Sequence, residues 1–187
     1  MQHAGTLMYW EDPLLLEGSM EVESNAIMFR GGSKPPAAFV DSATAVIADS
    51  FDGYLNHYAY NTLVPAAVAR DGYVDWARRT VADAAGAAIL LRDGEAAIAA
   101  ATLRFNTGGK AVVAEVELAS VVSTEQGAGR YRELWSVVRR MARDSGAERL
   151  IISTQASNIR VQRAWARLGL VPLAAFDTIH AIADHGS

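Results

Sequence analysis

The sequence predicts an α/β (α+β) protein with a mixed, largely antiparallel central sheet flanked by helices. Short apolar or alternating runs indicate strands, and longer stretches with a period near 3.6 residues indicate helices. The pair Asp93-Gly94 between two apolar runs is typical of a hairpin, which joins antiparallel strands. Strands and helices are interspersed along the chain, as expected for a sheet that helices cover.

The first half of the chain contains few strand signals. Residues 1–24 have no clear period and are expected to form an N-terminal extension or an irregular first segment, with a single domain over residues 25–187. The second of two neighbouring helices should turn Trp76 inward. The expected elements are one strand and three helices, at residues 25–30, 37–51, 65–70 and 74–85.

The second half alternates more regularly. A turn residue, Gly146, separates a strongly amphipathic helix from a short buried strand, and Gly169 ends the following helix. Residues 170–183 are expected to form two short strands with Asp177 near the bend. The other expected strands lie at residues 87–92, 95–105, 111–122 and 149–154, and the helices at residues 128–145 and from Ser157 or Asn158 onward.

Composition limits the classes of function. The 187 residues are 51% hydrophobic and 20% charged, which indicates one globular domain. The net charge of −4 disfavours nucleic acid as the main partner. The absence of cysteine excludes disulfides, cysteine-ligated zinc and an acyl-cysteine intermediate. No metal-binding histidine spacing, membrane span or basic leader is apparent, so we expect a cytoplasmic protein without a metal.

A small-residue turn follows the alternating run of residues 111–122 and opens the next helix. The glycines of residues 126–131, Gln-Gly-Ala-Gly-Arg-Tyr, allow a phosphate to approach the backbone closely. The first N–H groups of a helix lack internal partners and carry the positive end of its dipole, so the turn is a candidate anion site. It is neither a Walker A loop nor a Rossmann fingerprint, and an ordinary turn is the alternative.

Beyond this turn, the chain has Asn158 at the next predicted helix start, Trp165 seven residues on, and then Gly169 and Leu170. With the glycine turn, this order resembles the GCN5-related N-acetyltransferase (GNAT) superfamily over roughly residues 27–180. The resemblance implies a GNAT-like acyl-CoA fold in which the turn holds the CoA pyrophosphate and a backbone N–H near the strand end polarises the thioester carbonyl. The implied cofactor-binding residues are Val121, Val122, Gln126, Gly127, Ala128, Gly129, Arg130, Tyr131 and Asn158.

The resemblance also implies an N-acetyltransferase with acetyl-CoA as cosubstrate and a small-molecule amine as acceptor. Attack is expected to be direct, in a ternary complex, because no nucleophile for a covalent intermediate is apparent. The family usually has Tyr where Trp165 stands, and an indole cannot protonate the departing sulfur. The alternative is therefore a non-catalytic acyl-CoA-binding or regulatory module on the same fold, and a homodimer is left open.

Two carboxylates lie on the predicted central strand. Alternation places Glu115 and Glu117 on one face and Ala114, Val116 and Leu118 on the other. Two close carboxylates raise at least one pKa, which suits a base that removes a proton from an ammonium before attack. We predict Glu117, the nearer to the turn, as the base and Glu115 as a substrate-binding residue. A solvated strand edge or a structural ion pair is the alternative.

A stretch rich in aromatic and polar side chains follows the first predicted helix. It contains Tyr54, Asn56, His57 and Tyr58, and the family resemblance places this segment over the acceptor site. His57 is a second candidate for the base, since an imidazole changes charge near neutral pH. The alternative is a packed surface segment in which the histidine has only a structural role.

Overall fold

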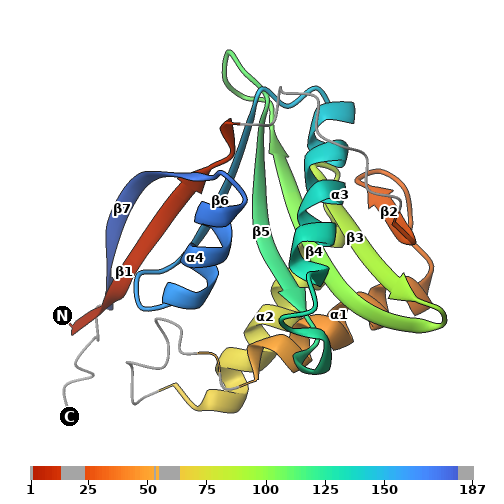
Figure 1. Ribbon diagram of the computed structural model, residues 1–187, viewed down its shortest axis with the longest axis horizontal. Helices are drawn as coiled ribbons and strands as arrows, with labels where there is room; N and C mark the ends of the chain where they lie inside the picture. Colours follow the sequence, from red (N-terminus) through yellow and green to blue (C-terminus); the bar gives the residue numbers. More distant parts are fainter. Residues whose placement is uncertain (1, 14–23, 53, 55–63, 181–187) are drawn as a thin grey trace, which may run out of the picture.

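The computed structural model describes residues 2–13, 24–52, 54 and 64–180. In these residues a seven-stranded sheet runs in the order β2-β3-β4-β5-β6-β1-β7, with helices on both faces (Figure 1). Neighbouring strands pair antiparallel except β5 and β6, which pair parallel. The predicted fold class, a mixed and largely antiparallel sheet flanked by helices, is confirmed.

The first half of the described chain supplies β1 (Gln2–Glu11), β2 (Ala26–Arg30), α1 (Ala37–Phe51) and α2 (Ala66–Ala82). The two helices expected at residues 65–70 and 74–85 are therefore one helix. Glycine weakens a helix interior by about 1 kcal/mol, and the burial of the neighbouring Tyr73 and Ala77 offsets this cost at Gly72. Trp76 is 37% exposed, so the prediction that it faces inward is wrong.

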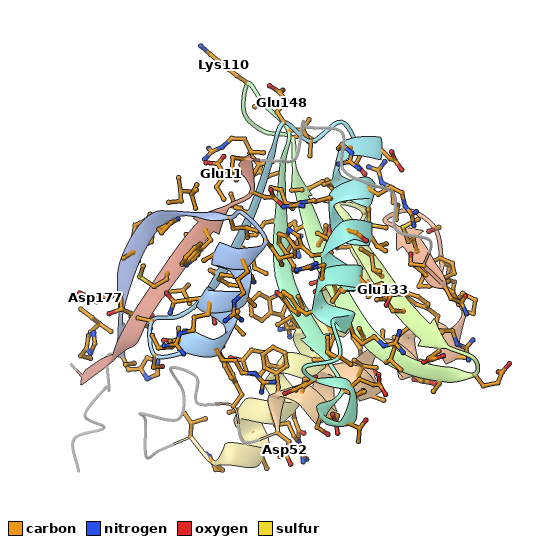
Figure 2. The ribbon with its side chains drawn as sticks, in the orientation of Figure 1. Glu11, Asp52, Lys110, Glu133, Glu148 and Asp177 are labelled. Carbon is orange, nitrogen blue, oxygen red and sulfur yellow. The ribbon has the colours of Figure 1, made fainter. Side chains whose placement is uncertain are left out.

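The second half supplies β3 (Gly86–Asp93), β4 (Ala96–Asn106), β5 (Val113–Val121), α3 (Arg130–Asp144), β6 (Arg149–Gln155), α4 (Ile159–Arg167) and β7 (Val171–His180). The described part of residues 170–183 forms one strand instead of two. Asp177 lies inside this strand, β7, at the outer edge of the sheet (Figure 2), and it pairs with Thr6 of β1.

A β-bulge at Glu117 interrupts the alternation of β5. Leu103 pairs with Val116 and Thr102 pairs with Leu118, so Glu117 is an extra residue opposite β4. Val116 therefore packs in the core beneath α3, whereas Leu118 packs in the core beneath α1 and α2. The prediction that Val116 and Leu118 share a face is wrong, because a bulge shifts every later side chain to the opposite face.

The strand β1 lies inside the sheet, between β6 and β7. The expected irregular extension before residue 25 is therefore wrong for residues 2–11. Asp12, which follows β1, has a fully buried side chain that accepts hydrogen bonds from Trp135 Nε1 at 2.7 Å and from Arg139 Nε at 2.5 Å. This buried ion pair ties the start of the chain to α3.

Removal of the Asp12 carboxylate should destabilise the protein strongly, because Arg139 would keep a buried charge without its partner. We expect Asp12→Ala to lower the free energy of unfolding in urea by about 3 kcal/mol. The adjacent Glu11→Ala is the matched control, because Glu11 pairs with the more exposed Arg149 and should cost about 0–1 kcal/mol. Equal losses in the two variants would show that β1 is not anchored in this way.

Helices α1 and α2 cover one face of the sheet, and α3 and α4 cover the other. The parallel ladder of β5 and β6 is short, from Val113 opposite Arg149 to Val116 opposite Ile152. It lies at the end of the molecule where Lys110 and Glu148 are labelled in Figure 2. Beyond it the two strands diverge toward the bottom of the view in Figure 1. This divergence positions the candidate site.

Candidate active site

A cleft of about 720 Å³ lies where β5 and β6 diverge. Residues 117–121 of β5 and residues 152–155 of β6 form two of its walls. The glycine turn, single residues of β1 and β7, and both helical layers also contribute, so the cleft passes between the strands and opens toward both layers. The α3 and α4 layer supplies Tyr131, Arg132, Arg160, Trp165 and Arg167, and the α1 and α2 side supplies Ser50, Phe51, Tyr54, Tyr73 and Trp76.

The glycine turn has the geometry of an anion site. Gly127 and Gly129 have φ of 94° and 85°, a left-handed conformation that other residues rarely adopt. The Ala128 N–H donates to the Glu125 carbonyl at 3.3 Å. Four other N–H groups, at or just before the start of α3, have no hydrogen-bond partner among the described residues: those of Gly127, Gly129, Arg130 and Tyr131.

Arginine side chains lie around this turn. The Arg130 guanidinium binds Asp93, Glu125 and Glu133 at 2.5, 3.1 and 3.3 Å, and the hydrogen bond to Glu125 is the main cause of its raised pKa. Its side chain is therefore committed to carboxylates, and Arg130 is not among the residues that line the cleft. Three other arginines line the cleft without an ion pair among the described residues: Arg132, Arg160 and Arg167.

Gln126 and Asn158 hold neighbouring elements together at the rim of the cleft. Gln126 Nε2 donates to the Val121 carbonyl at 3.1 Å, and its Oε1 accepts from Arg160 Nη1 at 2.8 Å. Asn158 caps α4 through its Oδ1, and its Nδ2 donates to Thr154 Oγ1 at 3.1 Å. Both residues line the cleft, where their present contacts fix the turn against β5 and α4 against β6.

The pairing of β5 with β6 ends at Val116, and the residues of β5 that follow it line the cleft. The Val122 N–H donates to the Ile98 carbonyl at 3.0 Å, so this predicted donor is already engaged. Donors alternate sides along an antiparallel strand, which directs the N–H groups of Ala119 and Val121 away from β4 and toward the opening. Of the two predicted donors, Val121 is thus the one whose N–H faces the cleft.

Glu117 lines the cleft from the bulge of β5, and its side chain is only 8% exposed. One carboxylate oxygen accepts from Arg104 Nε at 2.8 Å and the other accepts from the hydroxyl of Thr80 on α2. Arg104 also binds Asp83 at 2.8 Å and thereby lowers the pKa of that exposed carboxyl. Glu117 therefore forms an ion pair, as the alternative interpretation of this residue expected, and it also lines the cleft.

Glu115 is not among the residues that line the cleft, because it lies on the paired part of β5 opposite Ile151. Its pKa is raised, mainly by burial and further by the charge of Glu117. The expected rise in one pKa of the carboxylate pair thus occurs, although burial is the larger cause. The position of Glu115 gives it no contact with a ligand in the cleft.

Tyr131 and Trp165 form a contact that sequence reasoning missed. Trp165 Nε1 donates to the Tyr131 hydroxyl at 2.8 Å, and both residues line the cleft. An indole nitrogen can only donate, so the phenolic oxygen is the acceptor and its own hydrogen is left without an acceptor among the described residues. Burial raises the pKa of Tyr131 to about 12, and the hydroxyl therefore stays protonated at neutral pH.

The side of the cleft beneath α1 and α2 is formed by Phe51, Tyr54, Tyr73 and Trp76, which we call the aromatic wall. The rings of Phe51 and Tyr73 stack at 4.4 Å with an angle of 29°, and those of Tyr73 and Trp76 stack at 6.3 Å with an angle of 21°. The Tyr54 hydroxyl lies 3.2 Å from Thr154 Oγ1 across the opening. Of these, only Tyr54 was predicted to line the site.

The other predicted acceptor-side residues, Asn56, His57 and Tyr58, lie outside the described residues. Within residues 2–13, 24–52, 54 and 64–180, no group of three or more histidine or acidic side chains is arranged to hold a metal ion. In the same ranges no helix has the length and apolar character needed to cross a membrane.

The sequence profile of the acetyltransferase (GNAT) family matches residues 54–170, which include the glycine turn, β5, α3 and most of the cleft. A search of curated proteins found no match.

Solved structures share the fold. A functionally unknown conserved protein from Staphylococcus epidermidis superposes with a TM-score of 0.62 at 13% identity, covering 91% of this chain and 59% of the other. A Novosphingobium aromaticivorans protein assigned to the GNAT family gives 0.57 at 16% identity, covering 92% and 62%. This chain therefore spans less than two thirds of either protein. The aminoglycoside N-acetyltransferase AAC(6')-Iy in complex with CoA gives 0.52 at 13% identity, covering 90% and 99%.

Proposed function

The chain belongs to the acetyltransferase (GNAT) family, and from this premise we propose that it transfers the acetyl group of acetyl-CoA to the amine of a small metabolite. The observation that supports the proposal is the cleft that opens to both layers of the fold. One side offers unpartnered amides and unpaired arginines to an anionic cosubstrate, and the other offers the aromatic wall and Glu117 to an acceptor. Amine-dependent release of free CoA from acetyl-CoA tests the proposal.

In the proposed reaction the turn holds the CoA pyrophosphate on the N–H groups at the start of α3. The acyl chain then enters the opening between β5 and β6, and the Val121 N–H is the proposed donor to the thioester carbonyl. The neutral amine attacks the carbonyl carbon, the C–S bond breaks, and the sulfur leaves with the bonding electrons. A non-catalytic acyl-CoA-binding module is the competing function, and it would bind CoA without transfer.

Glu117 is the proposed acceptor of the amine proton. Among the described residues it is the carboxylate that lines the cleft on the side of the aromatic wall. Arg104 and Thr80 fix its orientation, and a water can relay the proton to an oxygen that already accepts one hydrogen bond. Preorganisation of this kind favours transfer over a freely rotating carboxylate.

We further propose that the Tyr131 hydroxyl donates a hydrogen bond to the departing sulfur. The Trp165 N–H orients the phenol, and the unassigned phenolic hydrogen is available to a ligand in the cleft. A hydrogen bond to a group that gains negative charge contributes about 1.5–3 kcal/mol. The hydroxyl thus supplies, from α3, the donor that an indole on α4 cannot provide.

Tyr131→Phe should lower kcat by about 10-fold or more, because the variant cannot stabilise charge on sulfur. The variant should also bind CoA less tightly than the wild type does, while the two proteins bind desulfo-CoA with equal affinity. Calorimetric titration with both nucleotides measures this difference without turnover. An equal loss of affinity for CoA and desulfo-CoA would place the hydroxyl elsewhere on the cosubstrate.

A further inference from the structure

We propose that the acceptor carries its amine on a flat, apolar and preferably aromatic body, which binds against the aromatic wall. This inference rests on the proposed function and names the class of its second substrate. The alternative acceptors are polycations, such as polyamines and aminoglycosides, for which the described residues offer a single carboxylate, Glu117, beside the wall.

The shape of the wall supports a flat ligand. The rings of Phe51, Tyr73 and Trp76 follow one another at small interplanar angles of 29° and 21°, so they form a stepped stack. Tyr73 is 8% exposed and belongs to the core beneath α1 and α2, whereas Trp76 at the end of the stack is 37% exposed. The stack therefore ends in an indole that is partly exposed and borders the cleft.

An exposed indole at the end of a stack is a binding surface for another aromatic ring. Offset-stacked rings attract one another beyond the effect of buried area, and a small-molecule site is typically lined by apolar and aromatic groups with few polar ones. Two polar groups near the wall are already engaged, since the Ser50 hydroxyl donates to the Val121 carbonyl at 2.8 Å and the Tyr54 hydroxyl lies 3.2 Å from Thr154 Oγ1. The buried Ser120 hydroxyl, which also lines the cleft, has no partner among the described residues.

The charge of the wall disfavours a polycation. Glu117 is the carboxylate that the described residues place on this side of the cleft, and its charge is balanced by Arg104 at 2.8 Å. A ligand with several ammonium groups would have to give up hydration without gaining a matching set of carboxylates. A single amine that loses its proton before attack does not face this cost.

The test is a comparison of acceptors in the wild type and in Trp76→Ala. With acetyl-CoA saturating, kcat/KM should be higher for 2-phenylethylamine than for n-butylamine, spermidine or kanamycin. Trp76→Ala should lower kcat/KM for 2-phenylethylamine by about 3- to 10-fold, mainly through KM, because one stacking contact is lost. The loss of kcat/KM should be clearly smaller for n-butylamine, because its alkyl chain has no ring to stack on the indole.

Val68→Ala is the matched control, because Val68 is a 59% exposed residue of the same helix that does not line the cleft. It should leave all four acceptors unchanged. A preference for spermidine or kanamycin, or an equal loss for 2-phenylethylamine and n-butylamine in Trp76→Ala, would overturn the inference.

Calorimetric titration of the CoA-loaded protein with 2-phenylethylamine separates this inference from the proposed function. Binding that weakens in Trp76→Ala, without acetyl transfer to any amine, would support the aromatic site and overturn the transferase proposal. Transfer to amines with no dependence on Trp76 would overturn only the aromatic site.

Discussion

Glu117→Gln should lower kcat by about 10²-fold or more while leaving the Kd for CoA nearly unchanged, since loss of a general base typically costs 10²–10⁴-fold. The substitution preserves the shape of the side chain and removes its ability to take a proton. Glu117 lines the cleft where it contacts Thr80 of α2, whereas the glycine turn that we propose for CoA lies before α3, so the two effects are separable. The acidic limb of the rate–pH profile should disappear in the variant.

The control for this prediction must account for the ion pair of Glu117 with Arg104. Asp83→Asn removes the other carboxylate that binds Arg104, and Asp83 is 41% exposed and does not line the cleft. Both variants should be compared at equal fractions of folded protein. We expect kcat of Asp83→Asn to stay within about 3-fold of wild type, because no proton acceptor is lost.

Unchanged kcat in Glu117→Gln would assign Glu117 a structural role only. His57 stays the competing prediction, and loss of kcat in His57→Ala alone would identify it as the base. If neither substitution matters, the acceptor arrives neutral and the enzyme acts by positioning and carbonyl polarisation.

The second large effect concerns Gly129→Val, which should raise the Kd for CoA by about 100-fold or more. The loss of two charge-assisted hydrogen bonds from the turn amides is sufficient for this change. Gly129 has φ of 85° and its added Cβ would meet no protein atom within 4 Å. The substitution therefore strains the turn and fills the space above the unpartnered amides, without a clash inside the protein.

Gly146→Val is the matched control for conformational strain. Gly146 follows α3 with φ of 74°, also has open space at its Cβ, and does not line the cleft. It should lower the Tm to a similar degree and leave the Kd for CoA unchanged. Equal affinity for CoA in Gly129→Val and the wild type would remove the pyrophosphate from this turn. Rising salt should weaken CoA binding in the wild type, because unpaired arginines line the cleft.

Local patterns were sufficient to predict the elements from β3 to α4. The Asp93-Gly94 turn indicates the β3–β4 hairpin, and the period of residues 128–145 indicates α3, because each signal lies within one short segment. The position of β1 could not be predicted, since its partners are residues 151–155 and 171–180 at the far end of the chain. The bulge at Glu117 could not be predicted for a similar reason, because a bulge is defined by the pairing of β5 with another strand, β4.

In the candidate site, too, the features set by a short segment could be predicted and those set by distant contacts could not. Gly127 and Gly129 could be singled out because a glycine turn before a helix has a local physical meaning. The ion pair of Arg130 with Asp93, 37 residues away, and the pairing of Trp165 with Tyr131, 34 residues away, depend on how separate elements pack. The aromatic wall likewise combines α2 with the end of α1, and no spacing in the sequence links them.

Release of free thiol from acetyl-CoA, measured with and without amine, tests the proposed transfer most directly. The protein contains no cysteine, so every thiol that appears comes from CoA. We predict thiol release that depends on the amine and equals the amount of N-acetylated product. Saturable binding of CoA without amine-dependent thiol release, over a panel of aryl, alkyl and polycationic amines, would contradict a transferase and identify an acyl-CoA-binding module.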